Sequence, residues 1–132
     1  MKKSYKEYLK DIDTFIFDVD GVFTDGTVLI TEKGEMLRKM NVKDGYALKT
    51  ALSKGYRVCI ISGGTNEGVR HRFKGLGVTD IYLGADNKID KLEEYMHLND
   101  IKPVQMLYMG DDLPDIPAMK QAQLACCPQN AV

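Results

Sequence analysis

The sequence predicts an α/β fold with a doubly wound, Rossmann-like and mostly parallel sheet. Apolar runs such as 13–19 and 56–61 alternate with amphipathic stretches, which is typical of buried parallel strands and their crossover helices. Each of these runs ends in polar or glycine-containing residues, at the edge where open α/β sheets bind ligands. One β-rich segment early in the chain interrupts the alternation, and it predicts a small β-hairpin flap.

The expected elements follow one another in a regular order. Residues 13–19 form a first buried strand, and 27–31 with 35–42 form the hairpin, which has Gly34 in its turn. Four helices and four strands then alternate: helix 44–54, strand 56–61, helix 65–76, strand 80–83, helix 88–99, strand 104–109, helix 113–121 and a last strand that begins at 124–126. This order favours parallel strands that are joined by crossover helices.

Composition narrows the class of protein. A chain of 132 residues, 44% hydrophobic and 28% charged, predicts one globular domain over 1–132, and it leaves open whether the protein continues past Val132. The net charge of -1 without a basic face argues against a nucleic-acid partner. The chain lacks an apolar run of about 20 residues and a signal-peptide core, so we expect a cytoplasmic protein without a membrane partner.

Two carboxylates follow the first strand directly. Asp18 and Asp20 are spaced by one residue, so both can point to the same side where the strand ends. Two negative charges held this close repel each other, and a bound cation or a shared proton would relieve the repulsion. The alternative is a strand that is simply followed by an Asp-Gly turn at Gly21.

Three later strand ends also carry polar groups. Ser62 and Gly63 follow the strand 56–61, where a hydroxyl and backbone N–H groups can hold an anion or merely cap the next helix. Lys88 begins a helix, where its charge is unfavourable unless an anion such as a phosphate offsets it.

The last polar strand end is the most acidic. Gly110 is followed by Asp111, Asp112 and Asp115 within six residues. One acid can cap the next helix, but three exceed what capping requires. Hard oxygen ligands that gather near the first acid pair suit Mg²⁺.

These four features, taken in order from Asp18 to Asp115, resemble the four motifs of the haloacid dehalogenase superfamily of phosphohydrolases. The segments 18–26, 41–46 and 110–113 are more narrowly similar to the small phosphatases of 3-deoxy-D-manno-octulosonate 8-phosphate, which have no large cap domain. The resemblance implies a Mg²⁺-dependent phosphomonoester hydrolase of lipopolysaccharide biosynthesis that acts on a sugar-acid phosphate.

The resemblance also implies the catalytic and metal-binding roles. Asp18 is the expected nucleophile that forms an aspartyl-phosphate, and Asp20 is the expected general acid and base. The expected ligands of Mg²⁺ are Asp18, the backbone carbonyl of Asp20, and Asp111.

The remaining roles concern phosphate binding. Ser62, the Gly63 N–H and Lys88 are expected to hold the phosphate oxygens. Asp112 and Asp115 are expected to orient the metal shell or Lys88.

The same family implies an assembly. Its capless members form tetramers in which a neighbour's hairpin helps to close the site. The hairpin here has six apolar residues that could pack between subunits or on their own domain: Val28, Leu29, Ile30, Met36, Leu37 and Met40.

One position departs from the family pattern. Gly64 stands where octulosonate phosphatases often have an arginine that meets the sugar carboxylate. Lys43, Arg70, Arg72 or a residue of a neighbouring subunit could supply that charge instead. Because of this departure, the sequence also allows a nine-carbon sugar-acid phosphate or another small phosphoester as the substrate. Two further alternatives are a non-catalytic regulatory domain on the same fold and a signalling receiver domain.

Overall fold

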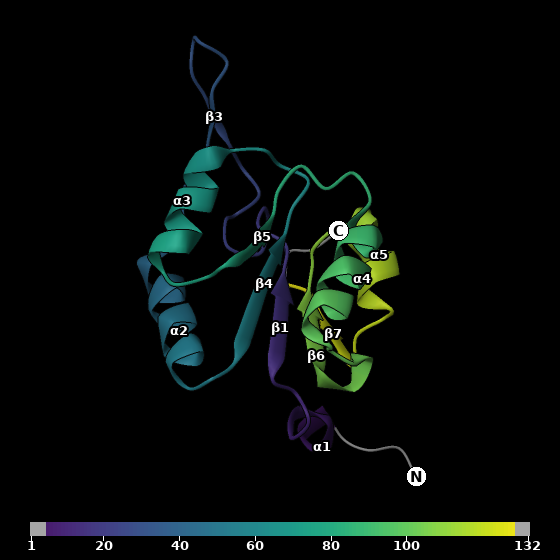
Figure 1. The fold of residues 1–132 in the computed structure, drawn as a ribbon. Coiled ribbons are helices and arrows are strands. Elements are labelled where there is room, and N and C mark those ends of the chain that lie inside the picture. Colours follow the sequence, from purple (N-terminus) through teal and green to yellow (C-terminus); the bar gives the residue numbers. More distant parts are fainter. Residues whose placement is uncertain (1–4, 129–132) are drawn as a thin grey trace.

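A five-stranded parallel sheet forms the centre of the protein in the computed structural model, which describes residues 5–128 (Figure 1). Its strands are β1 (Thr14–Phe17), β4 (Arg57–Ile61), β5 (Asp80–Tyr82), β6 (Met106–Met109) and β7 (Leu124–Cys126). They are ordered β5-β4-β1-β6-β7, and every neighbouring pair is parallel. The predicted α/β class is therefore confirmed.

The strand order also decides between two of the alternatives. Counted along the chain within this sheet, the strands lie in the order 3-2-1-4-5, as in Rossmann-type sheets. A receiver domain has the order 2-1-3-4-5, so that alternative is wrong. The order reverses between β1 and β6, and this switch point is where doubly wound sheets bind ligands.

Helices cover both faces of the sheet. α2 (Val42–Ser53) and α3 (Glu67–Gly75) lie on one face, and α4 (Lys88–Asn99) and α5 (Ile116–Met119) lie on the other (Figure 1). Successive strand residues point to opposite faces. Ile60 accordingly joins the buried cluster beneath α2 and α3, whereas Cys59 and Ile61 join the cluster beneath α4 and α5.

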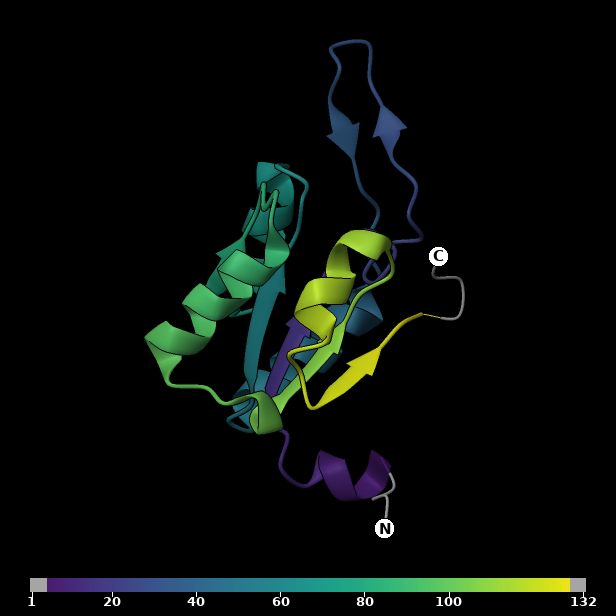
Figure 2. The same ribbon diagram turned by 90° about the vertical axis from the view of Figure 1, so that its right-hand side faces the viewer.

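The hairpin projects beyond the carboxyl ends of the sheet strands (Figure 2). It consists of β2 (Leu29–Ile30) and β3 (Met36–Leu37), which pair in the antiparallel direction. Both strands are shorter than predicted, because their side chains are exposed and no second layer supports a longer ladder. Met40 instead packs against the core beneath α2 and α3, so it contacts its own domain.

Several predicted boundaries need correction. α3 begins at Glu67 and not at 65, because the Asn66 side chain caps it by accepting from the N–H of Val69. The predicted helix 113–121 is divided into a 3₁₀ turn, η2 (Leu113–Asp115), and the short helix α5. Prolines at positions 114 and 117 lie in the first turns of these two elements, where proline is tolerated.

Two short elements near the predicted strands were not expected. The helix α1 (Tyr5–Leu9) precedes β1, and the 3₁₀ turn η1 (Pro103–Gln105) takes the first residues of the predicted strand 104–109. Helices of the length and apolar character that a membrane crossing requires are absent from the part of the chain that the structure describes.

Candidate active site

Polar residues that follow three strands and begin one helix meet around one cavity at the carboxyl edge of the sheet. Asp18 follows β1, Ser62 follows β4, and Asp111 follows β6, while Lys88 is the first residue of α4. The cavity has a volume of about 420 Å³. Its lining residues are Asp18, Asp20, Gly26, Ser62, Gly63, Gly64, Ala85, Asp86, Lys88, Asp111, Asp112 and Pro114. Asp115 is fully buried outside this lining.

Three carboxylates form a compact acidic cluster. One oxygen from each of Asp18, Asp111 and Asp115 lies within 4.8 Å of the others. Burial raises the pKa of Asp18 to about 7, even though the nearby charge of Lys88 opposes the shift. Burial and the charge of Asp115 likewise raise the pKa of Asp111. A cation bound here would remove the electrostatic cost of holding these acids ionised together.

Two members of this cluster, Asp18 and Asp111, offer the hard oxygen donors that suit Mg²⁺. That ion binds oxygen ligands at about 2.0–2.1 Å, so ligand atoms on its opposite sides are about 4.2 Å apart. The cluster oxygens all lie within 4.8 Å of one another, which is compatible with this separation. Gly21 makes room for the arrangement, because its φ is +86° and a Cβ at this position would overlap the Asp111 carboxylate.

Lys88 forms a buried ion pair with two of these acids. Its Nζ lies 2.8 Å from Oδ1 of Asp115 and 3.2 Å from Oδ1 of Asp18, and its side chain is only 7% exposed. Burial alone would lower the pKa of Lys88, but the hydrogen bond to Asp115 and the charge of Asp18 raise it above its usual value. The positive charge that is unfavourable at a helix start is thus offset by two carboxylates.

Asp115 is fully engaged by other groups. Its Oδ1 accepts from Lys88 and, at 3.2 Å, from the Tyr108 hydroxyl, and its Oδ2 accepts from the N–H of Asp112 at 3.4 Å. Sequence reasoning missed Tyr108, because a tyrosine within an apolar strand gives no sign of a polar partner. With both oxygens occupied, Asp115 is better suited to hold Lys88 than to bind a cation.

The loop after β4 presents Ser62 to the cavity. The Ser62 side chain is buried, and its Oγ accepts from the N–H of Gly64 at 3.2 Å. Asn66, and not Ser62, caps α3. The helix-cap interpretation of Ser62 is therefore wrong. Asp112, in contrast, does cap η2, since its side chain accepts from the N–H of Leu113 at 2.7 Å.

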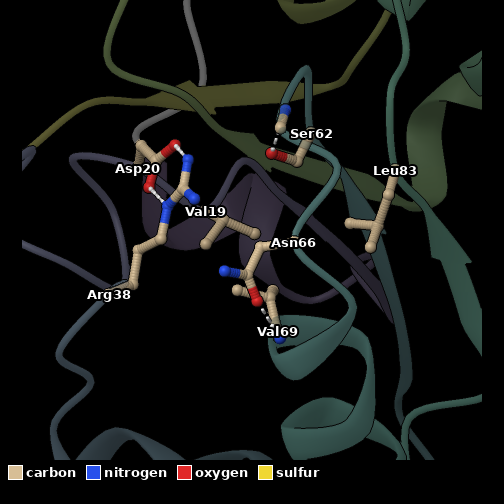
Figure 3. Close-up of a pocket in the computed structure, with 8 residues that line it drawn as sticks. Val19, Asp20, Arg38, Ser62, Asn66, Val69 and Leu83 are labelled. Carbon is tan, nitrogen blue, oxygen red and sulfur yellow. Dashed lines mark hydrogen bonds and ion pairs between the residues drawn. The ribbon is translucent and has the colours of Figure 1, made fainter. Parts of the chain in front are cut away.

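Asp20 does not belong to the acidic cluster, and it pairs with Arg38 from the hairpin (Figure 3). The Arg38 Nε and Nη2 donate to the two carboxylate oxygens of Asp20 at 3.1 and 3.2 Å. The Asp20 side chain thus has a different partner from Asp18 and Asp111. No sequence motif marked Arg38, because the contact joins residues 18 positions apart and depends on how the hairpin folds back.

The cationic residues suggested by the sequence lie elsewhere. Arg70 pairs with Glu67 on its own helix at 3.0 Å and donates to the carbonyl of Ile81. Lys43 is exposed on α2. Neither of these side chains, nor that of Arg72, lines the cavity that contains Asp18.

The chain is similar to known phosphatases in sequence and in fold. No family model matches the chain. The 3-deoxy-D-manno-octulosonate 8-phosphate phosphatase KdsC of Escherichia coli K12 is 37% identical over 116 residues, which are 88% of this chain and 62% of that protein. The chain therefore spans 62% of the length of the curated relative that it matches.

Solved structures are similarly close. The crystal structure of 3-deoxy-D-manno-octulosonate 8-phosphate phosphatase from Yersinia pestis is 34% identical with a TM-score of 0.92, and the match covers 95% of this chain and 68% of that one. The Moraxella catarrhalis phosphatase of the same name, solved with magnesium, phosphate and KDO, is 31% identical with a TM-score of 0.91, over 96% of this chain and 72% of that one.

Proposed function

We propose a function for this chain, which belongs to the haloacid dehalogenase-like phosphatases of the 3-deoxy-D-manno-octulosonate 8-phosphate type. The chain is a Mg²⁺-dependent phosphatase of that sugar-acid phosphate. The observation that carries the proposal is the gathering of Asp18, Asp111 and Lys88 at one cavity, at the switch point of the sheet. The identity of 37% to the Escherichia coli phosphatase supports the choice of substrate.

The proposed reaction proceeds in two steps. A carboxylate oxygen of Asp18 attacks phosphorus, the bond from phosphorus to the sugar oxygen breaks, and Asp20 gives its proton to that leaving oxygen. Asp20, now a carboxylate, takes a proton from a water molecule as the water attacks the phosphorus of the aspartyl-phosphate. The bond from phosphorus to Asp18 then breaks, which releases inorganic phosphate. Asp18 is again a carboxylate, and Asp20 again carries a proton.

The metal site of the proposal consists of Asp18, Asp111 and the backbone carbonyl of Asp20. When bound, Mg²⁺ offsets the repulsion between the anionic carboxylate and the anionic phosphate. Ser62, the Gly63 N–H and Lys88 hold the phosphate oxygens, where negative charge resides in the transition state. Asp115 fixes Lys88 in this position through their 2.8 Å contact, and Asp112 caps the turn that carries Asp115.

Removal of the metal tests this function. We expect a chelator in excess to abolish phosphate release from 3-deoxy-D-manno-octulosonate 8-phosphate, because Asp18 then faces the phosphate without a divalent cation to offset their repulsion. Added Mg²⁺ should restore the rate, whereas added Na⁺ at equal ionic strength should not. Phosphate release at an undiminished rate in the chelator would contradict the metal site.

The partners of the proposal are a small phosphorylated substrate and three further copies of this chain. Leu29 and Ile30 on the hairpin are 68% and 66% exposed, and the neighbouring Met36 and Leu37 are exposed as well. Apolar side chains that project in this way are suited to burial between subunits. We expect light scattering at micromolar concentration to give the mass of a tetramer, and Leu29→Lys with Ile30→Lys to lower it. A wild-type monomer would contradict this assembly.

A further inference from the structure

Arg38 places a guanidinium that donates from each of its three nitrogens beside the proposed general acid. Two of its nitrogen atoms donate to the two carboxylate oxygens of Asp20, and its Nη1 donates to the carbonyl of Met36 at 3.0 Å. The Arg38 side chain is 9% exposed, whereas that of Asp20 is 36% exposed. The guanidinium is thus held rigidly within the protein, and the carboxylate it grips stays accessible from the cavity.

The base of the hairpin is tied to α3 through the same carbonyl. The Asn66 Nδ2 donates to the carbonyl of Met36 at 2.6 Å, while the Asn66 Oδ1 caps α3 by accepting from the N–H of Val69 at 3.1 Å. Arg38 and Asn66 therefore share one acceptor on β3, and Figure 3 shows both side chains among the residues that line one small pocket with Asp20. These contacts fix the guanidinium relative to the sheet.

Gly64 leaves the space that Arg38 needs. A Cβ at this position would lie 3.2 Å from the Arg38 Nη2, 3.6 Å from the Ser62 Oγ and 3.8 Å from the Asp20 Oδ2. The guanidinium thus stands between the loop after β4 and Asp20. A larger side chain at Gly64 would compete for this place, so the glycine and the Arg38–Asp20 pair are compatible with each other.

We propose that Arg38 is a positioning residue, which holds the Asp20 carboxyl group in the orientation required for proton transfer to and from the leaving oxygen. This inference rests on the proposed function. The two-pronged pair matches the carboxylate that Asp20 becomes after its proton has left. When Asp20 carries the proton, one of its oxygens faces the leaving group while the other keeps its bond to Arg38.

The test compares two substrates that differ in their need for an acid. Proton transfer to a leaving group contributes about 10²–10⁴-fold to a rate. The sugar oxygen needs this proton, because it would otherwise leave as a basic alkoxide. The nitrophenolate of 4-nitrophenyl phosphate leaves readily without a proton. We expect Arg38→Met to lower kcat about 30-fold on 3-deoxy-D-manno-octulosonate 8-phosphate and less than about 3-fold on 4-nitrophenyl phosphate, with the octulosonate KM little changed.

Three further variants sharpen the result. Arg38→Lys, which keeps the charge but cannot grip both oxygens, should recover only part of the loss. Arg70→Met, which removes a guanidinium paired with Glu67, should leave both rates near wild type. The double variant with Arg38→Met and Asp20→Asn should lose no more kcat on the octulosonate phosphate than Asp20→Asn alone, because both changes act on the same step.

Three outcomes would overturn this inference alone, and the first two are an equal loss on both substrates and a wild-type rate of Arg38→Met on the octulosonate phosphate. Additive losses in the double variant would do the same. Circular dichroism of each variant checks that it is folded, and Arg38→Lys serves as the test if Arg38→Met is not. A wild-type chain that hydrolyses neither substrate in Mg²⁺ would instead overturn the proposed function, and this inference with it.

Discussion

Replacement of Asp18 by asparagine is expected to reduce kcat by at least about 10³-fold while the protein stays folded. The amide cannot attack phosphorus as a carboxylate does, and it is a poorer ligand for a divalent cation. The fold should tolerate the change, because burial already disfavours the charged form of Asp18 and raises its pKa to about 7. Phosphate release and the melting temperature are the two quantities to be measured.

Asp25, seven positions after Asp18, provides a matched control for the Asp18→Asn variant. Asp25 is an exposed acid whose Oδ1 accepts from the N–H of Thr27 at 3.0 Å, a bond that an asparagine can also accept. Asp25→Asn should therefore change kcat less than about 2-fold, in line with a surface site outside the machinery. If Asp18→Asn retained activity within about tenfold of wild type, Asp18 would not be the nucleophile.

The second large effect concerns stability. We expect Lys88→Met to lower the free energy of unfolding by about 3–5 kcal/mol, since loss of one partner leaves buried charges without compensation. Asp18 and Asp115 are 6% and 0% exposed, so water cannot solvate them in place of the lysine. Urea unfolding in the presence of a chelator measures the change without a cation that could substitute for Lys88.

Two comparisons make this result specific to the buried pair. Lys49→Met removes an exposed lysine on α2 and should shift the free energy of unfolding by less than about 0.5 kcal/mol. Lys88→Met combined with Asp115→Asn should recover part of the stability, because one of the unpaired charges is then gone. A loss below about 1 kcal/mol for Lys88→Met alone would show that the pair is solvated or rearranged in solution.

The sheet could be predicted from the sequence because strands such as β4 are buried on both faces. Runs such as 56–61 have almost no polar residue that could mark a solvent-facing side, and the structure places Val58 through Ile61 in the interior. The element ends were less predictable. Asn66 caps α3 through a side-chain hydrogen bond, whereas the sequence suggested Ser62 as a possible cap of this helix.

The site was predictable where its residues lie directly at strand ends. Four site residues each follow an apolar run or begin a helix, and the topology brings them to one cavity: Asp18, Ser62, Lys88 and Asp111. Arg38 could not be predicted in this way, since its position depends on a two-residue ladder between β2 and β3 and on the long reach of its side chain.

The burial of Asp115 was hidden from the sequence for a similar reason. The residue appeared as one of three acids in a polar loop, yet it is fully buried and accepts hydrogen bonds from Lys88 and Tyr108. Those partners come from α4 and β6, and only the packing of α4 onto the sheet brings them together. Local sequence spacing does not report contacts of this kind.

Steady-state hydrolysis by the wild-type chain in Mg²⁺ is the sharpest test of the proposed phosphatase activity. Inorganic phosphate should be released from 3-deoxy-D-manno-octulosonate 8-phosphate with a kcat/KM at least about tenfold above that for nine-carbon sugar-acid phosphates, a ratio equal to about 1.4 kcal/mol of transition-state stabilisation. If folded protein supplied with Mg²⁺ released phosphate from none of these esters, the proposed phosphatase activity would be contradicted.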